Sequence, residues 1–235
     1  MKLKDVMKAL EAKGSEQIKR ILMRHGAPAS LLGVRIGDMK PIAKQIKGDQ
    51  ALAMELFATG IGDAQYLAGM VADGAKMSRK ELQSWASGAS WMMVSGFSVA
   101  WVASENDAGW DLALEWIDSK KEHIAIAGWT TLAAWVTTHP DAELDLKTLQ
   151  RLLARVEKTI HAAPNQVKVQ MNYFVIALGT YVAPLGAAAI ATARRIGKVE
   201  VDVGDTDCKI PDAESYIIKS RRGAAIALKR KTVRC

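Results

Sequence analysis

Apolar residues recur at helical spacing along most of the chain, from its start to about residue 195. Apolar side chains fall three and four residues apart, and polar residues fill the positions between them, which is the pattern of an amphipathic helix. The pattern predicts helices over 3–12, 15–25, 39–47, 49–58, 63–73, 78–87, 89–103, 108–119, 122–137, 146–159, 165–181 and 184–196.

Short polar side chains at the starts of several of these segments support the assignment. Asp49, Asp63, Ser78, Asp107 and Asn165 are the residue types that accept hydrogen bonds from the free N–H groups of a first helical turn. We therefore expect each of them to be an N-cap.

The predicted fold class is all-α, with one helical domain over residues 1–196. The connections between helices are short, which suits either a compact bundle or a solenoid of helix pairs. The helix pairs span roughly 35–45 residues, within the range of HEAT and armadillo repeats. Periodicity alone leaves both architectures open, because the pairs share little sequence.

Residues 197–235 have a different pattern and are predicted to be an appendage to the helical domain. Val199, Val201 and Val203 alternate with acidic residues, which is typical of a β-strand. Gly204 follows as a turn signal, and 208–210 is a second extended piece that could pair back as a short β-hairpin. A basic tail ends the segment.

The net charge of +7 comes entirely from this tail. Seven of the 32 Lys and Arg residues fall within 219–235, which contains no Asp or Glu, so the rest of the chain is neutral. A basic tail favours nucleic acid or another polyanion as a partner. A solubilising end that binds nothing in particular is the alternative.

The remaining composition excludes several classes of protein. No run of 18 apolar residues indicates a membrane helix, and the first 20 residues lack a signal-peptide core, so the expected location is the cytoplasm. Cys208 and Cys235 are the only cysteines, and the four histidines have no metal-ligand spacing. We expect free thiols, no metal and no cofactor.

A cation cluster marks residues 33–44, which read GVRIGDMKPIAK. Asp38 is placed as the N-cap of the predicted helix 39–47, with Pro41 in its first turn. Arg35, Lys40 and Lys44 gather at this loop–helix junction, and a helix start with nearby cations suits a phosphate.

The same stretch resembles the motif near the N-terminus of the bacterial DNA alkylation-repair family, the alkylpurine DNA glycosylases built from HEAT-like repeats. The end of the chain, with GKVEVD and its basic terminus, looks like that of a bacterial subgroup of the same family. The resemblance implies a HEAT-like solenoid that binds double-stranded DNA on its concave face. It also implies hydrolysis of the N-glycosidic bond of cationic N3- or N7-alkylpurines.

Trp91 and Ser95 occupy the positions that the resemblance makes catalytic. In that family a tryptophan is followed four residues later by an aspartate, whose carboxylate stabilises the cationic sugar. Here Ser95 stands at the aspartate position, and a hydroxyl cannot supply the negative charge that an oxocarbenium-like centre requires. Asp111 and Glu115, which share a helix face, are candidate replacements, although a solvated face is the simpler interpretation.

Further DNA contacts are implied by the resemblance and by charge. Lys120, Lys121 and His123 lie where the family uses an arginine against the backbone, and Tyr173 is the aromatic residue nearest to a late family tryptophan. The tail adds Arg221, Arg222, Lys229, Arg230 and Lys231.

Two functional hypotheses follow. The first is a DNA-binding protein of the alkylation-repair family, which, if it is an enzyme, would hydrolyse the N-glycosidic bond of a cationic alkylpurine. The second is a non-catalytic helical-repeat adaptor for structured nucleic acid or a protein partner, which the serine at position 95 favours.

Overall fold

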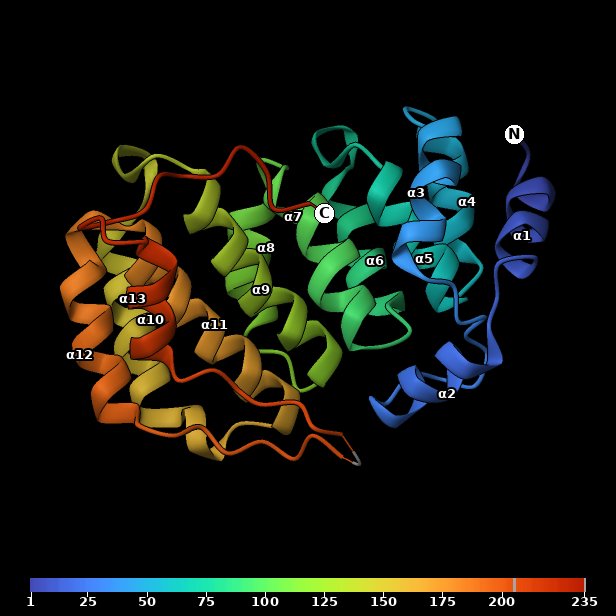
Figure 1. Cartoon of the computed structure of the whole chain (residues 1–235). Helices are drawn as coiled ribbons and strands as arrows, with labels where there is room; N and C mark the ends of the chain where they lie inside the picture. Colours follow the sequence, from blue (N-terminus) through green and yellow to red (C-terminus); the bar gives the residue numbers. More distant parts are fainter. Residues whose placement is uncertain (205, 235) are drawn as a thin grey trace.

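The structure is a computed structural model that describes residues 1–204 and 206–234. The described residues are helical or irregular, which confirms the all-α prediction (Figure 1). The α-helices are α1 Leu3–Glu11, α2 Glu16–Arg24, α3 Ile36–Gln45, α4 Gln50–Ala58, α5 Gly62–Val71, α6 Arg79–Gly88, α7 Ala100–Ser104, α8 Gly109–Trp116, α9 Glu122–Thr138, α10 Leu146–Thr159, α11 Asn165–Tyr181, α12 Gly186–Ile196 and α13 Ala213–Arg221.

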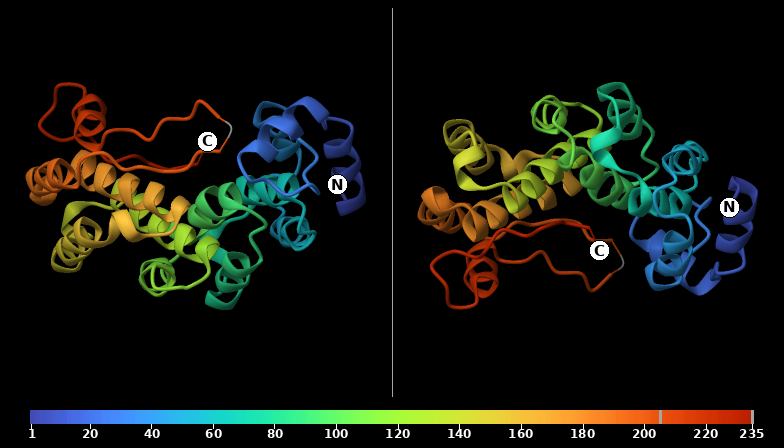
Figure 2. Two further views of the ribbon diagram at one scale, coloured as in Figure 1. Left: turned by 90° about the horizontal axis from the view of Figure 1, so that it is seen from below. Right: turned by 90° about the horizontal axis from the view of Figure 1, so that it is seen from above.

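The helices form two rows that bend into an arc (Figure 2). Helices α5, α7, α9 and α11 follow one another along the inner row, each in contact with the next either directly or through the π-helical segment Val94–Val99 that precedes α7. The outer row carries α4, α6, α8 and α10. This arrangement is a solenoid of helix pairs, in which each pair contacts its neighbours along the arc.

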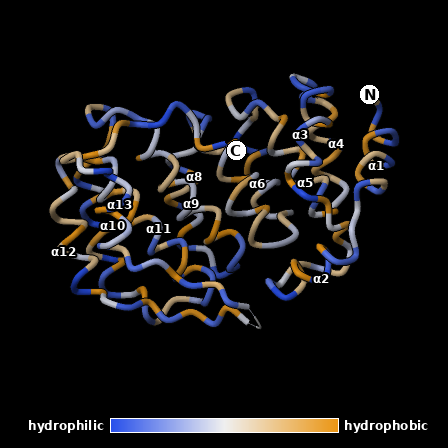
Figure 3. Tube along the Cα trace, viewed as in Figure 1, coloured by the Kyte–Doolittle hydropathy of each residue, from blue (hydrophilic) through white to orange (hydrophobic). Residues whose placement is uncertain are grey.

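Apolar side chains fill the space between the rows. Helix α9 belongs to both parts of this core, with Ile124 and Ala127 packed toward the N-terminal half and Trp129 and Leu132 toward the C-terminal half. Polar and apolar residues alternate along the helices, as Figure 3 shows, and helices such as α6 and α10 bury one apolar stripe. Helix α5, in the inner row, is buried at nine of its ten positions. Five of the seven tryptophans are buried, namely Trp85, Trp91, Trp101, Trp116 and Trp129.

Several helix starts agree with the sequence analysis and others do not. Asp49 and Ser78 accept hydrogen bonds from the first turns of α4 and α6, as expected of N-caps. The predictions for Asp107 and Asn165 were wrong, because Ala108 and Pro164 precede those helices as their caps. The predicted helix 89–103 is interrupted by the π-helical turn.

Asp63 is not an N-cap but a buried link between distant segments. It lies inside α5 and is 2% exposed, and its carboxylate accepts hydrogen bonds from the N–H groups of Leu32, at 2.6 Å, and Val34, at 2.8 Å. Gly33 lies between these two donors with a φ of 79° and packs directly on the backbone of Ser15 and Lys19. A side chain at position 33 would collide with that backbone.

This link places the start of α3 earlier than the sequence analysis expected. The helix begins at Ile36 with Arg35 as its N-cap, so Asp38 lies in the first turn and Pro41 lies inside the helix. The prediction for Asp38 was wrong because the loop before the helix is fixed by Asp63 rather than by a local cap.

The predicted β-hairpin is also wrong, since no β-strand occurs among residues 1–204 and 206–234. The backbone of Asp202 pairs instead with the side chain of Asn165, which donates to its carbonyl and accepts from its N–H at 2.9 Å. Asn172, two turns along α11, donates to the Pro211 carbonyl at 2.9 Å. Two of the three alternating valines pack against the helices, Val199 as a buried residue and Val201 as a partly buried one.

Within the described chain, no single helix is long and apolar enough to cross a membrane. Helices α11 and α12 pass that test only as a pair, with the short turn before α12 included, and they are bent by 112°.

Replacing Asp63 tests the buried link. We expect Asp63→Ala to lower the free energy of unfolding by about 3 kcal/mol, because two backbone donors lose a charged acceptor. Urea denaturation measures the change. Asp38→Ala is the matched control and should change it by less than about 1 kcal/mol. Equal stability of the two variants would contradict the assignment.

Candidate nucleic-acid interface

The C-terminal segment lies on the concave side of the arc (Figure 2). Residues 197–204 run along one edge, past the start of α11, toward α2, and 206–212 lead back to α13, which packs against α11 and α12. Residues 222–234, which we call the C-terminal strap, run from the end of α13 along the opposite edge (Figure 1). The C-terminal segment therefore lies along both edges of the concave face (Figure 1).

The strap is bound to the C-terminal turns of three inner helices. The N–H of Ala227 donates to the carbonyl of Thr180 in α11, and the N–H of Arg230 donates to Thr137 in α9, both at 2.9 Å. Arg234 donates to the carbonyl of Gly69 in α5 at 2.8 Å and is paired with Glu105. The last carbonyls of a helix have no intrahelical partner, and cations are favoured at this negative end of the dipole.

Two further cations of the segment make internal contacts. Arg221 donates to the Gly179 carbonyl at 2.9 Å. Lys229 donates to the Val136 carbonyl at 2.8 Å, and its ammonium lies 2.8 Å from the Asp141 carboxylate. Arg221, Lys229 and Arg234 therefore hold the tail to the fold.

Arg222, Arg230 and Lys231 have a different environment. All three are exposed, and none forms an ion pair within the described part of the chain. The backbone contacts of Ala227 and Arg230 fix the path of the strap, so its exposed cations have a defined place on one edge of the concave face.

A cavity of about 340 Å³ opens between α7, α9, α11, α13 and the strap. Three of its aromatic side chains are unusually exposed for their size: Phe97 at 39%, Tyr173 at 41% and Tyr216 at 44%. Arg230 lies at the strap side of the same cavity. Burial raises the pKa of Tyr173, so its phenol stays protonated at neutral pH.

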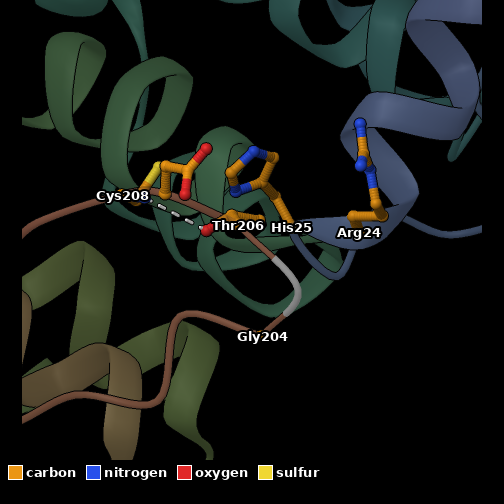
Figure 4. A pocket seen from close by; sticks show the side chains of 6 residues that line it. Arg24, His25, Gly204, Thr206 and Cys208 are labelled. Atoms are coloured by element: carbon orange, nitrogen blue, oxygen red, sulfur yellow. Dashed lines mark hydrogen bonds between the residues drawn. The ribbon is translucent and has the colours of Figure 1, made fainter.

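The opposite edge carries a second, more polar cavity of about 560 Å³, where Gly204 and 206–208 meet the end of α2. Figure 4 shows His25 directed toward Thr206 and Cys208, whereas Arg24 points away from them. The hydroxyl of Thr206 accepts a hydrogen bond from the Cys208 N–H. Residues 197–204 and 206–212 thus both extend along the concave side between α11 and α2.

The cations of the 33–44 stretch are all exposed. Arg35 is the N-cap of α3, and Lys40 and Lys44 lie one turn apart on the same face of that helix. Helix α3 lies in the N-terminal part of the arc, away from the strap cations (Figure 1).

Lys120, Lys121 and His123 lie at the start of α9. Both lysines are exposed, and Lys121 is the N-cap. His123 is half-buried, and its Nε2 atom has no hydrogen-bond partner among the described residues. Helix α9 has 17 residues, so this group lies about 25 Å from the strap at the other end of the helix.

Trp91 and Ser95 lie in the interior rather than on the concave face. Trp91 is 8% exposed, and its indole nitrogen packs against Gly62 at the start of α5. Ser95 is fully buried in the π-helical turn, where its hydroxyl donates to the Trp91 carbonyl at 3.4 Å. Glu115, one of the two carboxylates considered as replacements for the family aspartate, forms an ion pair with Arg79 at 2.5 Å.

The sequence analysis missed Phe97 and Tyr216 as members of this face. Phe97 was placed in a regular α-helix, and the π-helical turn changes the direction of the side chains within it. Tyr216 lies on α13, whose packing against α11 is a tertiary contact without a local signal.

Comparisons with known proteins agree with this architecture. The sequence profile of the family described as "DNA alkylation repair enzyme" matches residues 6–169. The chain belongs to this DNA alkylation repair enzyme family.

Two curated relatives come from Listeria. The uncharacterized protein Lin0241 of Listeria innocua is 32% identical over 218 residues, which cover 90% of this chain and 94% of the relative. The uncharacterized protein Lmo0209 of Listeria monocytogenes is 31% identical over the same shares.

One solved structure is similar over its whole length, with 37% identity, a TM-score of 0.90 and full coverage of both chains. It is described as a member of "a new family of proteins related to the HEAT-like repeat DNA glycosylases with affinity for branched DNA structures". The HEAT-like repeat fold of the present chain is thereby confirmed.

Removing the Lys229 ammonium tests the attachment of the strap. Lys229→Met keeps an aliphatic stem but removes the donor to the Val136 carbonyl and the cation beside Asp141, which retains only the Ala183 N–H as a donor. We expect a loss of about 1–3 kcal/mol in unfolding free energy and faster amide hydrogen exchange across 224–234. Lys231→Met is the control and should change stability by less than about 0.5 kcal/mol. Unchanged exchange in Lys229→Met would contradict the attachment.

Proposed function

We propose that this protein binds DNA on its concave face and prefers branched DNA to a simple duplex. The observation that carries the proposal is the combination on one face of unpaired cations with three half-exposed aromatic rings. Cations bind phosphates without regard to sequence, and aromatic rings stack on bases of any identity. The affinity of the structural relative for branched DNA supports the same conclusion.

The distribution of the cations suits a ligand with more than one arm. One group lies on α3 in the N-terminal part of the arc, a second at the start of α9 and a third on the strap. A junction offers phosphates of several strands in different directions, so separate groups of cations can each engage one arm. In this proposal Arg35, Lys40, Lys44, Lys120, Lys121, Arg222, Arg230 and Lys231 contact phosphates.

Binding rather than base excision is the proposed activity. Stabilisation of a cationic sugar requires a negative charge next to it. At the position of the family aspartate the chain has a buried neutral hydroxyl that is bonded to its own helix. Trp91 is packed in the core, so neither side chain is open to a DNA strand. This is the structured-nucleic-acid alternative of the sequence analysis.

Salt titration of DNA binding tests the phosphate contacts. We expect the association constant for a four-way junction, measured by fluorescence anisotropy, to fall steeply with salt. In the double variant Arg230→Ala/Lys231→Ala the slope of log K against log salt should fall by about two, one for each lost contact. Lys158→Ala, on the outer helix α10, is the matched control and should keep the wild-type slope. Salt-independent binding would exclude the proposal.

The absence of base excision is tested directly. Incubation with duplex DNA that contains 7-methylguanine or 3-methyladenine should release no free base above the rate without protein. The Ser95→Asp variant should release little or no base, because burial would keep the added carboxyl group protonated and uncharged. Release of base by the wild-type protein, abolished in Trp91→Ala, would establish a glycosylase instead.

A further inference from the structure

We infer that the cavity between α7, α9, α11, α13 and the strap binds one unpaired nucleobase of the DNA at a branch point. The inference rests on the proposed function, because the base reaches the cavity only if the DNA lies on the concave face. It adds a base-binding site to a surface that otherwise recognises the backbone.

The aromatic side chains provide the first argument. Phe97, Tyr173 and Tyr216 come from three different elements and line one cavity, each with about two fifths of its surface exposed. Phe97 is held from behind, since its ring lies 5.7 Å from that of Trp101 and 6.0 Å from that of Tyr66. Supported rings of this kind are suited to stack on a base.

The floor and size of the cavity provide the second argument. Gly96, Ala133 and Ala177 are among its lining residues and leave the space between the rings open. The volume of about 340 Å³ lies at the small end of the range for ligand sites. A flat heterocycle fits such a space better than a bulky, branched side chain.

The polar groups at the cavity provide the third argument. Thr180 lines it, is 1% exposed, and its hydroxyl has no hydrogen-bond partner among the described residues. A buried hydroxyl without a partner is unfavourable, and the ring nitrogen or carbonyl oxygen of a base would satisfy it. The protonated phenol of Tyr173 is a second potential donor.

The positive charge at the rim of the cavity favours a base that is part of a nucleic acid, because such a base is attached to a phosphate. Arg230 lies at the cavity, and Arg222 and Lys231 are exposed on the same segment without an ion pair in the described chain. A base attached to its phosphate matches an aromatic cavity with a positive rim. In an intact duplex the base must first be unstacked and unpaired, whereas at a branch point much of this cost is absent.

The test compares three DNAs by anisotropy: a duplex, a four-way junction with fully paired arms, and the same junction with two unpaired thymines at its centre. Wild-type protein should bind the last DNA most tightly. Tyr216→Ala should weaken binding to that DNA by about 5-fold to 150-fold, the range for loss of one stacked base. Its affinity for the duplex should stay within about twofold.

Further variants separate stacking from a loss of structure. Tyr216→Phe keeps the ring and should restore the preference, whereas Ala133→Leu should abolish it by filling the cavity. Ile218→Ala is the matched control, since Ile218 is exposed on the same helix but does not line the cavity. Circular dichroism establishes that each variant keeps its helical content.

The outcomes distinguish this inference from the proposed function. If wild-type protein binds junctions in a salt-dependent way but Tyr216→Ala behaves like wild type on all three DNAs, only the base site is refuted. An equal loss on all three DNAs also refutes it, because the tyrosine is then a general contact. If wild-type protein binds none of the three DNAs, the proposed function fails and the base site fails with it.

Discussion

Backbone groups that regular secondary structure leaves unpaired determine how the distant parts of this chain are joined. The C-terminal carbonyls of α5, α9 and α11 reach one edge of the arc and accept hydrogen bonds from the strap. At the other end of the chain, two loop N–H groups are satisfied by the buried carboxylate of Asp63. A buried polar group without a partner is costly, so these contacts fix where the terminal segments lie.

The same requirement divides the positive charge into two functions. Arg221, Lys229 and Arg234 are used inside the molecule, as partners of carbonyls and carboxylates. Arg222, Arg230 and Lys231 remain available to a ligand. The excess charge that the sequence places in a tail is therefore partly structural, and the attachment of the strap gives the remaining cations a defined position beside the aromatic cavity.

Membership of a repair family establishes the fold of this chain, whereas its chemistry depends on the individual residues of the site. At the positions expected to act on the sugar, the described chain has a core tryptophan and a buried serine. The exposed aromatic groups lie elsewhere, on the π-helical turn, α11 and α13. In a solenoid the repeats keep their packing whichever side chains occupy the exposed positions, so one fold can carry different binding surfaces.

The sequence by itself determined the helices and several of their caps, because helical spacing and residues such as Asp49 and Ser78 act within a few neighbours. It also determined the charge of the tail and the relation to the family. Tertiary structure decided what required distant partners. The backbone of Asp202 pairs with the side chain of Asn165 rather than with a second strand. Asp63 fixes the loop before α3 and thereby the start of that helix. The packing of α13 places Tyr216 at the same cavity as Tyr173. None of these contacts has a local signal, since each depends on the residue that the fold brings opposite.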